Sequence, residues 1–135
     1  MPRNRSLKTI FNQVETRTTI RHSYKLTADN NPVFITIIPG DTGQAALTNV
    51  ILDQKVIVEE HPGALINFNL GTSDELNLKR LKVITVITDR DGDPDLTSFE
   101  IELTGGLSTF NKKVQLVVTE QGETVGYEAN IKFFR

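Results

Sequence analysis

Four aspartates stand at alternate positions in one short segment, and no other cluster in this chain is as well suited to hold a cation. The segment reads Asp89-Arg90-Asp91-Gly92-Asp93-Pro94-Asp95. Calcium takes about six to eight oxygen ligands, and closely spaced carboxylates on one loop can supply several of them. The position of the glycine does not fit an EF-hand loop. Calcium is therefore the one cofactor that the segment suggests, in a different loop geometry.

The same residues also suit a plain β-turn. Asp, Gly and Pro are preferred turn residues, and acids at the tip of a hairpin keep it in water. The sequence leaves two interpretations open. We favour a solvated hairpin without any cofactor, and the alternative is a metal site formed by Asp89, Asp91, Asp93 and Asp95.

Other kinds of chemistry find little support in the chain. It has no cysteine, which excludes disulfides, thiolate zinc sites and cysteine nucleophiles. Its two histidines, His22 and His61, stand in separate segments, and the motifs of a nucleophile elbow and a phosphate-binding loop are missing. We therefore expect a protein that is not an enzyme and has no small-molecule substrate.

Positive charge is concentrated at the N-terminus, although the formal net charge of the chain is -2. Residues 1–25 contain one acid, Glu15, and six bases: Arg3, Arg5, Lys8, Arg17, Arg21 and Lys25. The plain interpretation is that the charges form solvated faces, and the alternative is a basic arm that meets an acidic surface on a partner or on a second copy. Nucleic acid is a weaker interpretation, because the basic segment lacks interleaved aromatic rings and the whole chain is acidic.

The first part of this arm has the spacing of an amphipathic helix. Over residues 6–15, the apolar side chains fall at i, i+3, i+4 and i+7, and they are Leu7, Ile10, Phe11 and Val14. Ser6 can act as the N-cap. A helix this short must pack on something. The residues that we expect to bind a partner are Arg3, Arg5, Leu7, Ile10, Phe11 and Phe134.

The rest of the chain alternates apolar and polar residues, which is the pattern of half-buried β-strands. The clearest case is 125–133, where Val125, Tyr127 and Phe133 share one side with Ala129 and Ile131. We predict eight strands within residues 17–26, 33–38, 48–59, 66–70, 81–88, 99–103, 114–119 and 125–133, with a bulge or break at Asp53-Gln54.

Short strands separated by turn residues predict an all-β fold. We expect a single antiparallel β-sandwich of jelly-roll or immunoglobulin-like kind, with a small barrel as the alternative. Residues 1–16 form the basic amphipathic arm and residues 17–135 form the sandwich. The predicted core consists of residues on the apolar sides of the strands: Ile66, Phe68, Val83, Phe99, Ile101, Leu103, Leu116, Val118, Ile131 and Phe133.

The functional hypothesis is a non-enzymatic β-sandwich that acts by protein–protein contact. We expect a structural or accessory subunit of a larger assembly, or an adaptor, that binds a protein partner or itself. The alternative is a calcium-dependent module that binds a membrane or a glycan through Asp89–Asp95. The sequence shows neither a signal peptide nor a membrane span. The expected location is therefore the cytoplasm or an intracellularly assembled particle, and a membrane partner is disfavoured.

Overall fold

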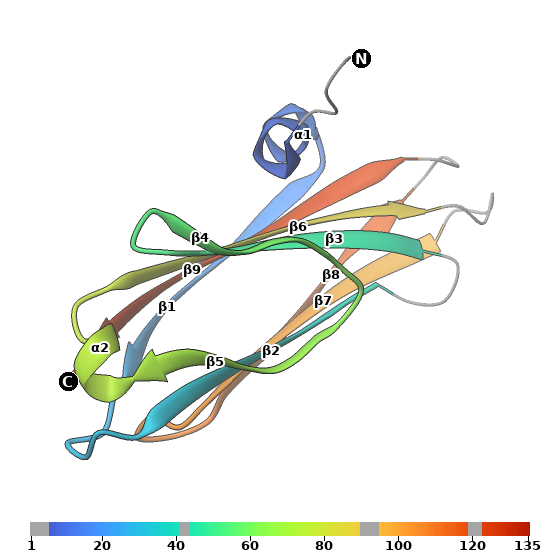
Figure 1. The fold of residues 1–135 in the computed structure, drawn as a ribbon. Helices are drawn as coiled ribbons and strands as arrows, with labels where there is room; N and C mark the ends of the chain where they lie inside the picture. Colours follow the sequence, from blue (N-terminus) through green and yellow to red (C-terminus); the bar gives the residue numbers. More distant parts are fainter. Residues whose placement is uncertain (1–5, 41–43, 90–94, 119–122) are drawn as a thin grey trace.

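A computed structural model of the chain describes residues 6–40, 44–89, 95–118 and 123–135. The described residues form nine strands and two short helices (Figure 1). Neither helix is long and apolar enough to cross a membrane. The elements in chain order are α1 (Leu7–Gln13), β1 (Arg17–Lys25), β2 (Pro32–Pro39), β3 (Gln44–Leu52), β4 (Lys55–Pro62), β5 (Leu65–Thr72), α2 (Ser73–Leu76), β6 (Arg80–Asp89), β7 (Asp95–Thr104), β8 (Phe110–Val118) and β9 (Thr124–Phe134).

The strands form two sheets that face each other, which confirms the predicted β-sandwich (Figure 1). The five-stranded sheet has the order β1-β9-β6-β3-β4 and the four-stranded sheet has the order β5-β2-β7-β8. Neighbouring strands run antiparallel, except that β1 is parallel to β9. The edge strands of one sheet are β1 and β4, and those of the other sheet are β5 and β8. The described strands therefore do not close into a barrel.

The predicted strand over 48–59 is in fact two strands, β3 and β4. They are joined at Asp53 and Gln54, whose φ angles are 50° and 72°. Two consecutive positive φ angles define the tight hairpin turn whose twist matches that of its flanking strands. The break expected at Asp53-Gln54 is therefore this hairpin turn, and the eight expected strands become nine.

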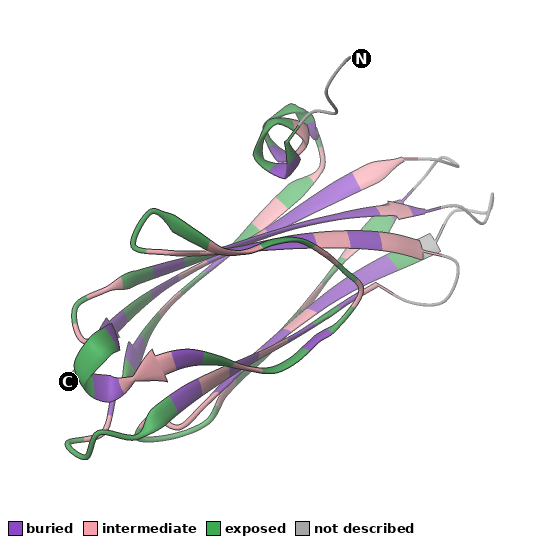
Figure 2. Cartoon of the chain, viewed as in Figure 1, coloured by how far each residue is buried: buried purple, intermediate pink, exposed green. Residues whose placement is uncertain are grey.

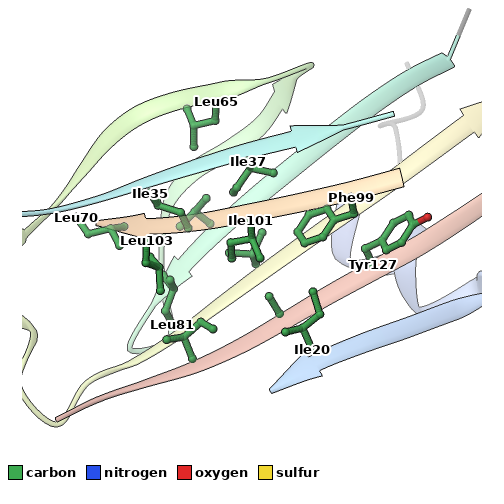
Figure 3. Packing of buried hydrophobic residues seen from close by; sticks show 14 of the residues in the cluster. Ile20, Ile35, Ile37, Leu65, Leu70, Leu81, Phe99, Ile101, Leu103 and Tyr127 are labelled. Carbon is green, nitrogen blue, oxygen red and sulfur yellow. The ribbon is translucent and has the colours of Figure 1, made fainter. Parts of the chain in front are cut away.

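The core lies between the two sheets and follows the alternation along each strand (Figures 2 and 3). Val125, Tyr127 and Ala129 of β9 are fully buried, while Lys132 on the opposite face of that strand is exposed. The Phe99 ring of β7 stacks on the Tyr127 ring across the core, with centroids 5.3 Å apart. Most predicted core residues are buried: Val83, Phe99, Ile101, Leu103, Val118, Ile131 and Phe133. Phe68 and Leu116 are partly buried against this core.

The prediction that Ile66 lies in the core is wrong, because 59% of this residue is exposed. Leu65 and Leu70 are buried instead. In a regular strand these two residues would point to opposite faces, because an odd number of positions separates them. Asn67 between them has a φ of 49°, and the pairing of β5 with β2 shifts register at this point. A bulge of this kind exchanges the inward and outward faces of a strand.

One ring contact and two hydrogen bonds connect the edge strand β1 to the opposite sheet. The His22 ring stacks on the Phe110 ring of β8, with centroids 3.8 Å apart. The Tyr24 hydroxyl lies 2.7 Å from the Ser108 carbonyl oxygen, to which it donates, and accepts from the Gly106 N–H at 2.9 Å. Side chains of β1 therefore fasten the five-stranded sheet to the β7–β8 connection.

Helix α1 packs on the outer face of the five-stranded sheet (Figure 1). Ser6 caps it as predicted, because its hydroxyl accepts from the Thr9 N–H at 3.3 Å. Leu7 and Phe11 are buried in a small cluster with Ile84 and Val86 of β6. A Cβ atom placed on Gly126 would lie only 2.8 Å from the Phe11 ring. The ring can therefore pack this closely on β9 only because residue 126 is glycine.

Replacement of Phe99 by alanine tests the assignment of the core. We expect Phe99→Ala to lower the free energy of unfolding by about 3–5 kcal/mol, because the lost ring leaves a cavity against Tyr127. Ile66→Ala serves as the control and should change it by less than about 0.5 kcal/mol, as at other exposed positions. Denaturant unfolding of both variants measures the difference, and equal losses would contradict the reported faces.

The stability of the fold should fall in alkaline solution. Burial raises the pKa of Tyr24 and the pKa of Tyr127 above 10.0, although hydrogen bonds from Gly106 and with Thr97 partly oppose the shifts. The unfolded chain then loses these protons first, so the stabilisation is complete below pH 10.0 and is lost as the pH rises further. As the pH rises above 10.0, the free energy of unfolding should fall less steeply for Tyr24→Phe than for the wild-type protein. An unchanged slope would contradict the assignment.

Candidate basic groove on the outer sheet face

The outer face of the five-stranded sheet contains a groove beside α1. It has a volume of about 1200 Å³ and crosses the whole sheet, from the edge strand β1 over β9, β6 and β3 to the other edge strand β4. Its charged lining residues are Lys8 of α1, Arg21 of β1, Arg80 and Lys82 of β6, Lys132 of β9, and the acid Asp53. All six are exposed. We refer to this surface as the basic groove.

Strand pairing sets the positions of the charges in the basic groove. Across one row, Arg21 pairs with Asn130, and Asn130 pairs with Lys82. In the next row, Lys132 stands directly opposite Arg80. Paired residues on neighbouring strands lie about 5 Å apart, and alternate residues along one strand lie about 7 Å apart. Four cationic side chains therefore leave adjoining positions of the same sheet face.

Within the described part of the chain, no ion pair neutralises these cations. The one salt bridge among described residues joins Arg135 to Asp74, at the end of the sandwich where α2 lies. Asp53 lines the basic groove and its backbone N–H donates to the Arg80 carbonyl oxygen at 2.8 Å, but its carboxylate forms no ion pair. Like charges directly opposite on neighbouring strands destabilise a sheet. An anion in the basic groove would relieve that repulsion.

The floor of the basic groove is partly apolar. Lys82 pairs with Ile51 of β3, and Ile51 pairs with Val56 of β4, a residue that is 46% exposed. Ile84 of β6 lines the groove where α1 begins to cover the sheet. Among the described lining residues there is no Phe, Tyr or Trp. The ring of His22, which also lines the groove, is already stacked on Phe110, so the groove can contact an anionic ligand through charges and through aliphatic surface.

Helix α1 separates the basic groove from a second hollow of opposite charge. This hollow has a volume of about 610 Å³ and is lined by Ile10, Leu47 and the acids Glu15, Glu60 and Glu123. The positive surface is therefore confined to one side of the helix. The helix forms one wall of the groove and contributes Lys8 to it.

The structure changes the interpretation of the residues that the sequence assigned to partner binding. Leu7 and Phe11 are covered by the chain's own sheet, so they are not available to a partner. Ile10 is half-buried and lines the acidic hollow. Phe134 is half-buried on the outer side of β9, opposite to the buried Phe133. Arg3 and Arg5 lie outside the described residues.

The acidic segment is only partly described. Asp89 is not a turn residue, because it is the last residue of β6 and its side chain is buried. Its N–H donates to the Glu123 carbonyl oxygen at 3.2 Å. Asp95 is the first residue of β7, while Asp91 and Asp93 lie outside the described residues. Among the residues that are described, no three histidines or acids form a cluster suited to a metal.

Sequence reasoning missed Arg80, Lys82 and Lys132 as a group. Lys82 and Lys132 lie within the predicted strands 81–88 and 125–133, and Arg80 directly precedes the first of them, but these two segments are far apart in the chain. They come together only because β6 and β9 are neighbours. A correct pairing of the segments 81–88 and 125–133 would have been needed to find them.

Comparison with protein-family models, with curated proteins and with solved structures returns no match for this chain. Any statement about its function therefore depends on its own residues.

Calcium titration tests the metal interpretation of the acidic segment. We expect calcium to leave the melting temperature almost unchanged, because Asp89 is buried and belongs to a strand. A calcium site would instead stabilise the fold by about 2.7 kcal/mol at a hundredfold excess of free calcium over the dissociation constant. A rise in melting temperature that Asp91→Asn with Asp93→Asn removes would establish the site.

Proposed function

We propose that this chain is a non-enzymatic protein that acts by protein–protein contact and binds an acidic segment of its partner in the basic groove. It would serve as an accessory or structural subunit of a larger assembly, or as an adaptor. The observation that carries the proposal is the group of Arg21, Arg80, Lys82 and Lys132 on adjoining positions of one sheet face, which form no ion pair with the described residues.

A protein segment fits the basic groove better than a nucleic acid does. Single-stranded nucleic acids are bound by aromatic platforms beside a positive track, and the described lining has no such platform. The formal net charge of the chain, -2, also opposes a long polyanion. Ile51, Val56 and Ile84 favour a ligand that has apolar side chains between its acids. Polypeptides supply that combination.

The shape of the groove disfavours a membrane surface. Helix α1 lies above the outer face of the five-stranded sheet (Figure 1), and its Lys8 lines the groove. A flat bilayer could not reach the sheet positions of Lys82 and Asn130 beside this helix, whereas a narrow extended segment could. A segment bound in the groove would contact side chains on the sheet face and would not pair with the backbone of the edge strands β1 and β4.

The expected binding is weak and sensitive to salt. An exposed ion pair contributes about 0.2–1 kcal/mol, so four such pairs contribute about 1–4 kcal/mol. Aliphatic contacts with the groove floor would add to this at about 25 cal/mol per Å² of buried apolar surface. Exposed charges are screened over about 8 Å at physiological ionic strength. Complementary charge of this kind mainly accelerates and orients association.

Charge reversal tests the proposal. We expect a labelled peptide in which glutamate alternates with valine to bind the wild-type protein at low ionic strength, measured by fluorescence anisotropy. Arg80→Glu with Lys82→Glu should abolish this binding, because the variant repels the peptide from the centre of the groove. The matched control is Lys112→Glu with Lys113→Glu on β8, which changes the net charge equally on the other sheet.

The control should bind as the wild type does. Equal loss of binding in both double variants would mean that net charge alone attracts the peptide. Failure of the wild-type protein to bind at low ionic strength would also contradict the proposal.

A further inference from the structure

Leu78 has a backbone conformation that does not suit its side chain. It follows Asn77, the C-cap of α2, and its φ is 68°. This is the left-handed conformation that commonly ends a helix, and glycine is the usual residue there because a Cβ atom is disfavoured. Hydrogen bonds hold the conformation, since the Leu78 N–H donates to the Phe133 carbonyl oxygen at 3.1 Å and the Lys79 N–H donates to that of Leu76 at 2.9 Å.

Burial of the Leu78 side chain does not offset this backbone strain, because the side chain is mostly exposed. It is 70% exposed, the largest value among the exposed large apolar residues of the described chain. Leu76, two positions earlier, is fully buried and fastens α2 to the core. Glycine at position 78 would remove both the strain and the exposed apolar surface. A strained, exposed apolar residue is therefore a reason to look for a binding role.

Leu78 lies at one end of the basic groove. Leu78 directly precedes the Lys79–Arg80 segment that continues into the groove, and its N–H is bonded to β9 at Phe133. The next residue of β9, Phe134, faces outward on the same side as Lys132 and is half-buried. Lys25 of β1 pairs with Phe134. The backbone of Leu78 therefore lies beside the end of β9 that carries Phe134, and we call these two apolar residues the apolar end.

We infer that the apolar end anchors one apolar side chain of the same acidic segment that the basic groove binds. This inference rests on the proposed function. Asn130, in the central row of the groove, precedes Phe134 by four positions on β9, which corresponds to about 13 Å. An extended ligand covers that distance with about four residues. The partner is therefore a protein segment in which an acidic run stands about four residues from a leucine or a similar apolar residue.

Three labelled peptides separate the two contributions. The first has the glutamate–valine run, a short glycine–serine spacer and a leucine placed to reach the apolar end. The second has serine in place of that leucine, and the third keeps the leucine but has glutamine in place of each glutamate. The first should bind about tenfold more tightly than the second, a typical effect of burying one apolar side chain. The third should bind most weakly.

The variant that tests the role of Leu78 is Leu78→Gly. It should raise the melting temperature of the protein, because strain is removed, and it should reduce the affinity for the leucine peptide to that for the serine peptide. Binding of the serine peptide should not change. Phe134→Ser should have the same selective effect on binding. Val117→Ser is the control, because Val117 is 58% exposed on β8 of the other sheet.

The possible failures are distinguishable. Equal binding of the leucine and serine peptides by the wild-type protein would overturn the anchor and leave the basic groove in place. Loss of serine-peptide binding in Leu78→Gly would overturn it as well, because Leu78 would then act through the groove's structure. Absence of binding by both acidic peptides would overturn the proposed function and the anchor together.

Discussion

Two central strands of the five-stranded sheet, β9 and β6, must bury one face, and the rest of the structure depends on this constraint. The inward residues of β9, from Val125 to Phe133, are buried against the opposite sheet. Side chains in a strand alternate between two faces, so the intervening residues must point outward. Lys132 and, on β6, Arg80 and Lys82 are thereby fixed on one surface. The core and the basic groove therefore lie on opposite faces of the same strands.

Helix α1 depends on that outer surface and also shapes it. A helix of only seven residues is not stable alone in water, so its packing decides whether it forms. Gly126 provides the space for the Phe11 ring, and Arg17 lies over that ring at 5.5 Å from its centroid. The helix covers Ile84 and Val86 and leaves the cationic rows open. Residues Leu7–Gln13 of the arm that the sequence suggested thus form helix α1 beside the groove, and Lys8 of this helix lines the groove.

The sequence predicted those parts of the fold that depend on local patterns. Alternation located β9 and β7, a continuous run of β-branched residues located β6, and the i, i+3, i+4, i+7 spacing with Ser6 located α1. The break at Asp53-Gln54 was expected and is a hairpin turn, whereas the bulge at Asn67 was missed because a non-glycine residue there adopts a positive φ angle. Helix α2 was missed although Thr72 and Glu75 form a capping box, a signal that the sequence does contain. The groove required strand pairing, which no local pattern specifies.

The central claim is that ligands bind through side chains on the outer face of the five-stranded sheet. Nuclear magnetic resonance titration of the labelled protein with the glutamate–valine peptide tests it most directly, because it locates the contact residue by residue. The account predicts chemical-shift changes concentrated at Arg21, Arg80, Lys82 and Lys132 and at their neighbours in the groove. Changes confined to the four-stranded sheet, or to the backbone of an edge strand such as β4 or β8, would contradict it.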